Sequence, residues 1–188
     1  MNFEDAIALA KSRSDCEPKN IDTLVRIAKE TAHIHGSIAE CGSYRCGSTI
    51  ALAVANPKKK VFAFDLFGGL PYGEVGFENF KDADFKEIWA ATGPFTNIIL
   101  VSGKHEDTVP DFAFNNWSMI FMDSDYYESH KVCLSTFWPK LSSGGYVVFH
   151  DPTFEGVQKA IKETIPDIEV AEKGVLPDSK NMGYIIKS

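Results

Sequence analysis

Apolar and polar positions follow two different periods along the chain. Near the start, apolar residues recur at helical spacing in two segments, which predicts two helices. Farther on, short apolar runs typical of buried strands alternate with stretches of helical spacing. The two initial patterns are Phe3, Ala6, Ile7 and Ala10, and then Ile21, Leu24, Val25 and Ala28, with Asn20 and Asp22 as the expected caps of the second helix.

The alternation from residue 37 onward predicts the fold class. Strands that alternate with helices form a parallel sheet with helices on both faces, which is the doubly wound α/β arrangement. The last two strands have no helix between them, so we expect an antiparallel hairpin at the edge of the sheet. The expected strands are 37–41, 59–65, 97–102, 117–123, 144–151, 168–172 and 183–187, and the expected helices are 48–55, 85–93, 127–139 and 154–165.

Length and composition fit one domain. The chain has 188 residues, of which 44% are hydrophobic and 24% charged, and it shows no internal repeat or low-complexity segment. That length is enough for one substantial core. We therefore expect a single domain over 1–188, in which helices over 1–35 precede a core over 36–188.

Charge and cysteine content limit the kinds of binding partner and the cellular compartment that we expect for this protein. A formal net charge of -7 argues against non-specific nucleic-acid binding, which needs a cationic face. No apolar run approaches the roughly 18 residues of a membrane-spanning helix, and the first residues lack the apolar core of a signal peptide. The four cysteines show neither a disulfide framework nor paired zinc-ligand spacing. We expect a cytoplasmic protein with no nucleic-acid or membrane partner.

The stretch 38–55, IAECGSYRCGSTIALAVA, joins a strand, an acid, two glycines and a helix start. Ligands of open α/β sheets bind beyond the carboxyl ends of the strands. Gly42 and Gly47 would let a ligand approach the backbone there, and the helix beginning near Ser48 would offer free N–H groups. Glu40 suits an ammonium group, and Asp65, which ends the next strand, suits ribose hydroxyls. These residues favour S-adenosylmethionine; the alternative is a capping acid in a tight glycine turn.

A second group of polar residues follows the fourth and fifth strands. Asp123 and Asp125 come after one, and His150 and Asp151 after the other. Adjacent parallel strands lie about 4.8 Å apart, so these side chains should meet and could hold Mg²⁺. The metal would activate an acceptor hydroxyl and His150 would take its proton, which makes Asp123 and His150 the candidate catalytic residues. Alternatively, Asp123 caps the next helix and His150 bonds to a loop.

Two further patterns bear on the site. Phe77, Phe80, Phe85 and Trp89 lie at roughly helical spacing, which favours core packing, with the lining of an acceptor pocket as the alternative. No G-x-S-x-G motif occurs, so nucleophilic hydrolysis is not expected.

Four segments between residues 36 and 160 carry the motifs of a known family. They read GSIAECGSYRCGST, VFAFDLFGGLP, SGKHEDTVP and IFMDSDYYESHKVCLSTFWPKLSSGGYVVFHD. Together they resemble the macrocin O-methyltransferase-like branch of the class I S-adenosylmethionine-dependent methyltransferases. The resemblance implies a seven-stranded Rossmann-like sheet and the methylation of sugar hydroxyls, often with Mg²⁺.

The resemblance also implies a set of site residues. Asp123 and Asp151 would bind the metal. His150 stands where the family commonly has a further aspartate, and we keep it as a third candidate ligand. The expected cofactor-binding residues are Glu40, Gly42, Ser43, Gly47, Ser48, Asp65, Gly103 and Asp107.

The leading hypothesis is an O-methyltransferase that uses S-adenosylmethionine and a divalent metal to methylate a hydroxyl of a sugar, glycan or similar polyol. The chain is short for an enclosing lid, so we expect an open acceptor site. The alternatives are a methyltransferase of a catechol-like or amine acceptor and a non-catalytic S-adenosylmethionine-binding module. A nicotinamide oxidoreductase is disfavoured because Glu40 stands where the dinucleotide phosphate would need room. Homo-oligomer formation is left open.

Overall fold

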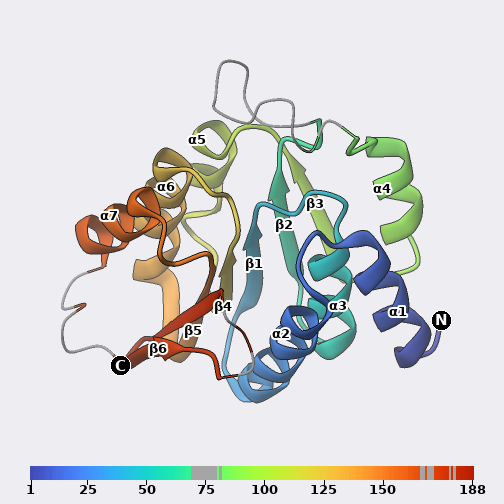
Figure 1. Ribbon diagram of the computed structural model, residues 1–188, viewed down its shortest axis with the longest axis horizontal. Coiled ribbons are helices and arrows are strands. Elements are labelled where there is room, and N and C mark those ends of the chain that lie inside the picture. Colours follow the sequence, from blue (N-terminus) through green and yellow to red (C-terminus); the bar gives the residue numbers. More distant parts are fainter. Residues whose placement is uncertain (69–79, 81, 166–167, 169–171, 178, 180) are drawn as a thin grey trace.

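Helices cover both faces of a mixed sheet in the computed structural model of the protein (Figure 1). The structure describes residues 1–68, 80, 82–165, 168, 172–177, 179 and 181–188. The strands are β1 Ser37–Cys41, β2 Val61–Asp65, β3 Ile98–Ser102, β4 Trp117–Met122, β5 Leu141–His150, β6 Glu172–Val175 and β7 Met182–Ile186. The helices are α1 Phe3–Arg13, α2 Pro18–Glu30, α3 Gly47–Ala55, α4 Phe85–Thr92, α5 His105–Thr108, α6 Tyr127–Phe137 and α7 Glu155–Thr164.

The order of the seven strands is β3-β2-β1-β4-β5-β7-β6. Strands β1 to β5 pair in parallel. The chain builds the sheet outward from β1 to β3 in one direction and then continues through β4 and β5 in the other. Such a reversal leaves a crevice at the carboxyl ends of the two central strands, β1 and β4. The predicted doubly wound α/β fold is confirmed.

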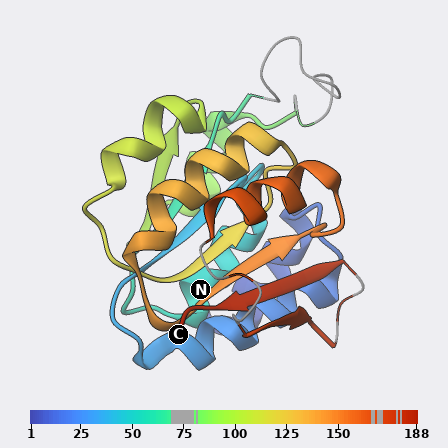
Figure 2. The same cartoon turned by 90° about the vertical axis from the view of Figure 1, so that its left-hand side faces the viewer.

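Alternate residues of the central strands pack against opposite helix layers. On β4, Met119 and Phe121 join the core beneath α2 and α3, whereas Ile120 and Met122 join the core beneath α6 and α7. Figures 1 and 2 show α1, α2 and α3 on one face of the sheet and α5, α6 and α7 on the other. Every residue of β4 is buried. A strand covered on both faces is mostly apolar, which is why the sequence of β4 lacks the alternation of a half-exposed strand.

Helix α2 begins earlier than its expected caps. Pro18 occupies its first turn, where the missing N–H of proline costs nothing, and Glu17 precedes it. Asn20 is fully buried within the helix, and Asp22 forms an ion pair with Lys11 at 2.7 Å. The prediction that Asn20 and Asp22 cap this helix was wrong.

The last two strands form the expected antiparallel hairpin. Strand β7 pairs with both β5 and β6, so β6 is the edge strand. The expected strand 168–172 lies partly outside the described residues, and the observed β6 begins at Glu172. In the part of the chain that the structure describes, no helix has the length and apolar character needed to cross a membrane.

Candidate functional site

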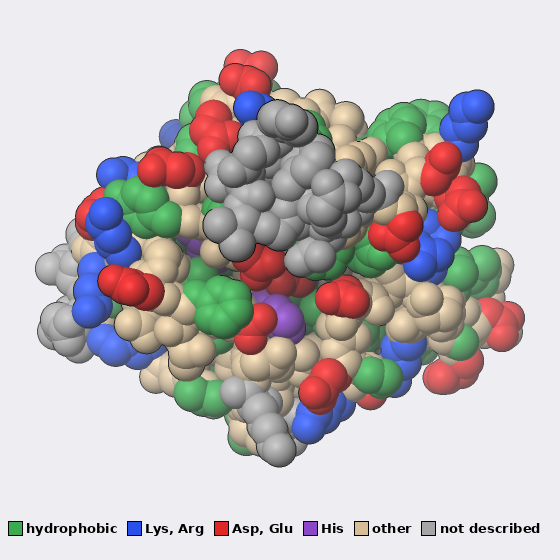
Figure 3. All heavy atoms as spheres, turned by 45° about the horizontal axis from the view of Figure 1, so that its top comes forward, with side chains coloured by type: hydrophobic (Ala, Val, Ile, Leu, Met, Phe, Trp, Pro, Cys, Tyr) green, Lys and Arg blue, Asp and Glu red, His purple; other side chains and the backbone are tan. Residues whose placement is uncertain are grey.

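A cleft opens at the carboxyl ends of the five parallel strands. Its empty space, which includes solvent at the open mouth, is about 1040 Å³. Every loop that follows one of these strands contributes to the lining, and so does the connection between α1 and α2. Six of the described lining residues are acidic: Asp15, Asp65, Glu106, Asp123, Asp125 and Asp151. Figure 3 shows acidic side chains around a histidine near the middle of this face.

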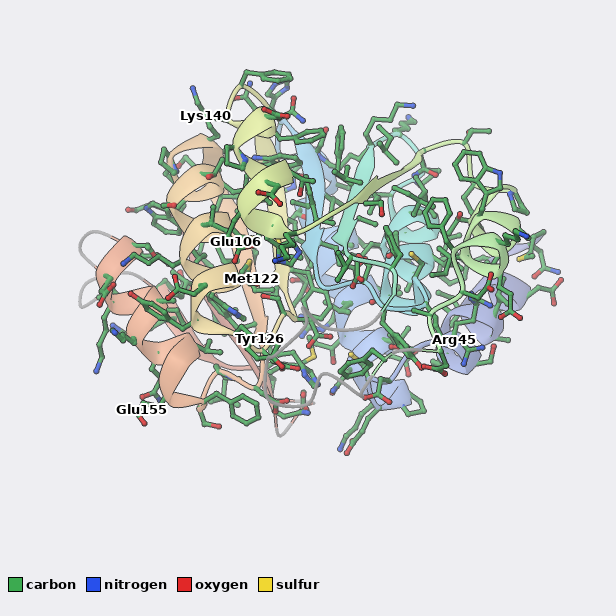
Figure 4. All side chains as sticks on the ribbon, turned by 90° about the horizontal axis from the view of Figure 1, so that it is seen from above. Arg45, Glu106, Met122, Tyr126, Lys140 and Glu155 are labelled. Carbon is green, nitrogen blue, oxygen red and sulfur yellow. The ribbon has the colours of Figure 1, made fainter. Side chains whose placement is uncertain are left out.

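The loops after β3 and β4 meet over the centre of the sheet. In Figure 4 the end of β4, marked by Met122, and the following Tyr126 lie near the middle of the molecule with Glu106 of α5 close by, whereas Arg45 and Glu155 lie toward opposite sides. Tyr126 and Glu106 both line the cleft.

Left-handed backbone is concentrated in these loops. After β1, β2, β4 and β5 the residues Tyr44, Phe67, Asp125 and Asp151 have φ values of 47°, 51°, 59° and 46°, and Gly103 after β3 has a φ of 146°. A side chain in this region costs of order 1 kcal/mol or more, and such strain gathers at functional sites. The strain therefore marks the same end of the sheet as the cleft.

Asp65 organises the loop that follows β1. Its Oδ2 accepts hydrogen bonds from the backbone N–H groups of Ser43 and Tyr44, both at 2.8 Å, and its Oδ1 accepts one from Phe67 at 2.7 Å. A carboxylate has about four lone-pair sites. The remaining acceptor capacity is available to a hydroxyl in the cleft, which Asp65 lines as expected.

The two glycines of the opening turn make room for the protein's own backbone. A Cβ at Gly42 would lie 2.1 Å from the carbonyl oxygen of Asp123, and one at Gly47 would lie 2.5 Å from backbone atoms of Ala10 and Ser14. Gly42 lines the cleft, whereas Gly47 does not. The structure thus places Gly47 away from the lining, where this glycine lets α3 begin close to the end of α1.

Glu40 is fully buried and does not line the cleft itself. It lies beside Ser43 and Ser48, which do line it. Its Oε2 accepts hydrogen bonds from the hydroxyls of Ser43 and Thr49. Its Oε1 is buried and has no hydrogen-bond partner among the described residues. Burial raises the pKa of Glu40 to about 7, although the neighbouring hydroxyls favour its charged form. An unpaired buried acceptor is costly, and a ligand ammonium group in the adjacent cleft would fit it.

Asp123, His150 and Asp151 come together as the sequence analysis expected. His150 Nδ1 lies 3.0 Å from Oδ1 of Asp123 and 3.0 Å from Oδ2 of Asp151. On the other side of the ring, the Asn181 amide nitrogen lies 2.9 Å from Nε2. The thiol of Cys16 donates a hydrogen bond to Oδ2 of Asp123 at 3.4 Å. Both oxygens of Asp123 and one oxygen of Asp151 are thus already in contact with protein donors.

The surroundings of His150 bear on the two roles expected of it, as a metal ligand and as a base. Burial alone would lower its pKa, but the hydrogen bond to Asp123 and the charges of Asp123, Asp151 and Asp125 raise the pKa to about 9. Among the described residues, no group of three or more histidine, cysteine or acidic side chains is arranged to hold a metal ion. With Nδ1 of His150 directed at the carboxylates of Asp123 and Asp151, this arrangement does not fit a divalent metal, and the expected role of His150 as a base stays a prediction.

The remaining cofactor candidates divide between the cleft and its surroundings. Ser43, Ser48 and Gly103 line the cleft. Asp107 does not; it is exposed on α5, and its neighbour Glu106 faces the cleft instead. A helical residue and its neighbour point about 100° apart, so the expected segment reaches the cleft through Glu106 and not through Asp107.

Sequence reasoning missed the contribution of the N-terminal segment. Ser14, Asp15 and Cys16 line the cleft, although they lie between two helices with no motif to mark them. Such a connection shows only a break in helical spacing, so its contact with the distant Asp123 could not be foreseen.

The aromatic residues before β3 are more exposed than expected. Trp89 is 65% exposed and Phe85 is 42% exposed, so the prediction that they pack in the core was wrong. Phe80 lines the cleft, as the alternative proposed, and Phe77 lies outside the described residues.

Comparison with known proteins agrees with this architecture. Residues 39–152 match the model of a methyltransferase-domain family. A relative from Streptomyces olivaceus, named 8-demethyl-8-(2,3-dimethoxy-alpha-L-rhamnosyl)-tetracenomycin-C 4'-O-methyltransferase, is 24% identical over 153 residues, which cover 69% of this chain and 58% of the relative. Demethyldecarbamoylnovobiocin O-methyltransferase from Streptomyces niveus is 25% identical over 148 residues, or 63% of this chain and 53% of the relative. The chain thus spans less than two thirds of either relative.

Solved structures share the fold over nearly the whole chain. The O-methyltransferase NovP superposes with a TM-score of 0.79 at 18% identity, covering 94% of this chain and 82% of NovP. The calicheamicin methyltransferase CalS11 superposes with a TM-score of 0.75 at 19% identity, covering 93% of this chain and 80% of CalS11. Because the family match alone covers more than half of the chain, this protein belongs to the methyltransferase-domain family and has the fold of its class I S-adenosylmethionine-dependent members.

Proposed function

We propose that this chain is an O-methyltransferase that transfers a methyl group from S-adenosylmethionine to a hydroxyl of a sugar or similar polyol. The observation that carries the proposal is the acidic cleft at the strand reversal, with Asp65 on its wall and an unpaired Glu40 oxygen next to it. The names of the two relatives, one of which acts on a rhamnosyl compound, support a glycosylated acceptor.

The residues of the cleft suit the parts of S-adenosylmethionine, which supplies an activated methyl group on a sulfonium. Asp65 has acceptor capacity left for the ribose hydroxyls. The buried Oε1 of Glu40 suits the amino group. The loop from Gly103 to Glu106 lines the same cleft and would lie against the adenine.

The acidic lining favours the substrate over its product. The sulfonium carries a positive charge, and methyl transfer leaves a neutral thioether. Carboxylates near the sulfur, among them Asp123, attract the first and not the second. The cleft should therefore bind S-adenosylmethionine more tightly than the demethylated product.

Methyl transfer breaks the carbon–sulfur bond, forms a carbon–oxygen bond and frees the hydroxyl proton. We assign this proton to the carboxylate of Asp123, which lines the cleft. Asp123 is held in place by His150 at 3.0 Å and by the Cys16 thiol at 3.4 Å. His150 thus orients Asp123, and no metal is required by this assignment. Asp125 and Asp151 offer further acceptors for the hydroxyls of a polyol.

The first experiment measures S-adenosylmethionine binding by calorimetry. A hydrogen bond to a charged group contributes about 1.5–3 kcal/mol, so Asp65→Asn should weaken binding by about tenfold to a hundredfold. Asp111→Asn changes an exposed aspartate outside the cleft and should leave the affinity as it is. No binding to the wild type, or equal binding by both variants, would refute the cofactor assignment.

The second experiment tests the acceptor with radiolabelled methyl transfer to rhamnosides, catechols and amines. Transfer to the rhamnosides supports the proposal, and preference for catechols or amines would replace it with methylation of another acceptor. Cofactor binding without transfer to any of the three would favour the non-catalytic module.

The N-terminal helices belong to the same functional unit in this proposal. Helices α1 and α2 pack against α3, and their connection lines the cleft. This supports the single domain over 1–188. All four cysteines are free thiols, which supports the proposed cytoplasmic location.

A further inference from the structure

A chain of side-chain hydrogen bonds reaches Nε2 of His150, the ring nitrogen that faces away from Asp123 and Asp151. The hydroxyl of Ser179 donates to Oδ1 of Asn20 at 2.7 Å, and Nδ2 of Asn20 donates to Oδ1 of Asn181 at 3.0 Å. Nδ2 of Asn181 then faces Nε2 of His150 at 2.9 Å. Asn20 and Ser179 are buried, so the chain connects α2, the segment before β7 and the end of β5 through the interior.

This chain has a direction, and the direction decides which ring nitrogen carries the proton. The Asn181 oxygen is occupied as an acceptor, so its N–H group is the end that meets His150. Nε2 must then accept, and the proton of the neutral ring must lie on Nδ1. Nδ1 of the ring therefore presents an N–H group.

The Nδ1–H group points at the place where a divalent ion would be needed. It lies 3.0 Å from one oxygen of Asp123 and 3.0 Å from one oxygen of Asp151. Two neighbouring carboxylates repel each other unless a positive group or a donor lies between them. A nitrogen ligand to a metal would have to offer its lone pair at this point, and Nδ1 offers a proton instead.

We propose that the Nδ1–H group of His150, held by the Ser179–Asn20–Asn181 chain, takes the place of a divalent cation between Asp123 and Asp151, so that this methyltransferase works without a metal. The proposal rests on the proposed function only for its last clause. In this arrangement Asn20 and Asn181 are positioning residues for His150, although they are far from it in the sequence.

The direct test is the ring of His150 in the wild-type protein. Two-bond ¹H–¹⁵N spectra of protein labelled with ¹⁵N-histidine distinguish a protonated from an unprotonated ring nitrogen, and His150→Asn identifies the signals. We expect a protonated Nδ1 in the wild type and loss of this preference in Asn181→Leu. An unprotonated Nδ1 in the wild type would overturn the proposal.

The second test is Mn²⁺ binding, measured by electron paramagnetic resonance on the protein without S-adenosylmethionine, so that it reads the site even if the cofactor assignment fails. We expect no saturable binding to the wild type and a gain of about tenfold or more in affinity in His150→Asp. His33→Asp adds the same charge at an exposed position and controls for non-specific binding to an acidic chain. If His150→Asp does not fold, His150→Asn leaves the two carboxylates free and should show a smaller gain.

The contrary outcomes of the metal test are equally definite. Saturable Mn²⁺ binding to the wild type that is lost in Asp151→Asn would show that the carboxylates already hold a metal. Folded His150→Asp with no more affinity than His33→Asp would show that the carboxylates do not form a cation site at all. Either result would overturn the proposal.

Discussion

Replacement of Glu40 by glutamine tests whether the buried acid lowers the free energy of unfolding at neutral pH while it contributes to ligand binding. Burial raises the pKa of Glu40 from its ordinary value of 4.5 to about 7. Between these values the unfolded chain releases a proton that the folded chain keeps. The free energy of unfolding of the wild type therefore contains a contribution that falls as pH rises through this window, and the loss is complete above pH 7.

The magnitude follows from the two pKa values. At about 1.36 kcal/mol for each pH unit, the rise from 4.5 to about 7 corresponds to a loss of about 3 kcal/mol. Glutamine cannot ionise and keeps the shape of the protonated acid. The difference in free energy of unfolding between Glu40→Gln and the wild type should therefore grow by about 3 kcal/mol in favour of the variant between pH 4.5 and pH 8.

Urea unfolding followed by circular dichroism across this pH range measures the difference. Subtracting the two proteins removes the titration of all other groups, and Glu155→Gln, at an exposed position, should follow the wild type within about 0.5 kcal/mol. A difference that does not change with pH would refute the reasoning. The stabilised variant should bind S-adenosylmethionine more weakly, because it lacks the charge that meets the amino group; unchanged affinity would remove Glu40 from the binding site.

Two further predictions concern the frame around the cleft. Gly42→Ala would place a Cβ 2.1 Å from the Asp123 carbonyl oxygen at a φ of 89°, so we expect a loss of at least about 3 kcal/mol in thermal unfolding. Gly68→Ala, whose Cβ would meet no atom of the described residues within 4 Å, should melt like the wild type. Equal melting of both variants would contradict the steric argument. Burial lowers the pKa of His130 from 6.5 to about 4. Between these values the unfolded chain binds a proton that the folded chain does not bind. The free energy of unfolding should therefore fall by about 3 kcal/mol as pH drops through this range. Urea unfolding of His130→Gln should lack this acid loss, and parallel curves for variant and wild type would count against it.

Some of the candidate site could be predicted because it depends on local pattern. Asp65 and Asp123 each follow an apolar run, and parallel strands bring such positions to one edge of the sheet. The prediction of a shared cleft needed no knowledge of which strands are neighbours. The chemistry at each position was harder to predict: Asp107 and Glu106 occupy the same short helix, and only its orientation decided that Glu106 lines the cleft.

Other parts of the site depend on contacts between residues far apart in the chain. Gly47 is required by the backbone of Ala10 and Ser14, and Asn20 bonds to Asn181 rather than capping its own helix. Neither contact leaves a period or a motif, because the partner lies in another element.

The sequence by itself determined the alternation of strands with all helices except the short α5, the parallel sheet with its antiparallel hairpin, and the edge at which the polar residues gather. These follow from hydrophobic spacing, which reports on burial within each element. Only the tertiary structure decided that Nδ1 of His150 lies between the carboxylates of Asp123 and Asp151. That outcome depends on the direction of a hydrogen-bond chain that passes from Asn20 to Asn181 through the interior, and the direction of such a chain is set by all of its members together.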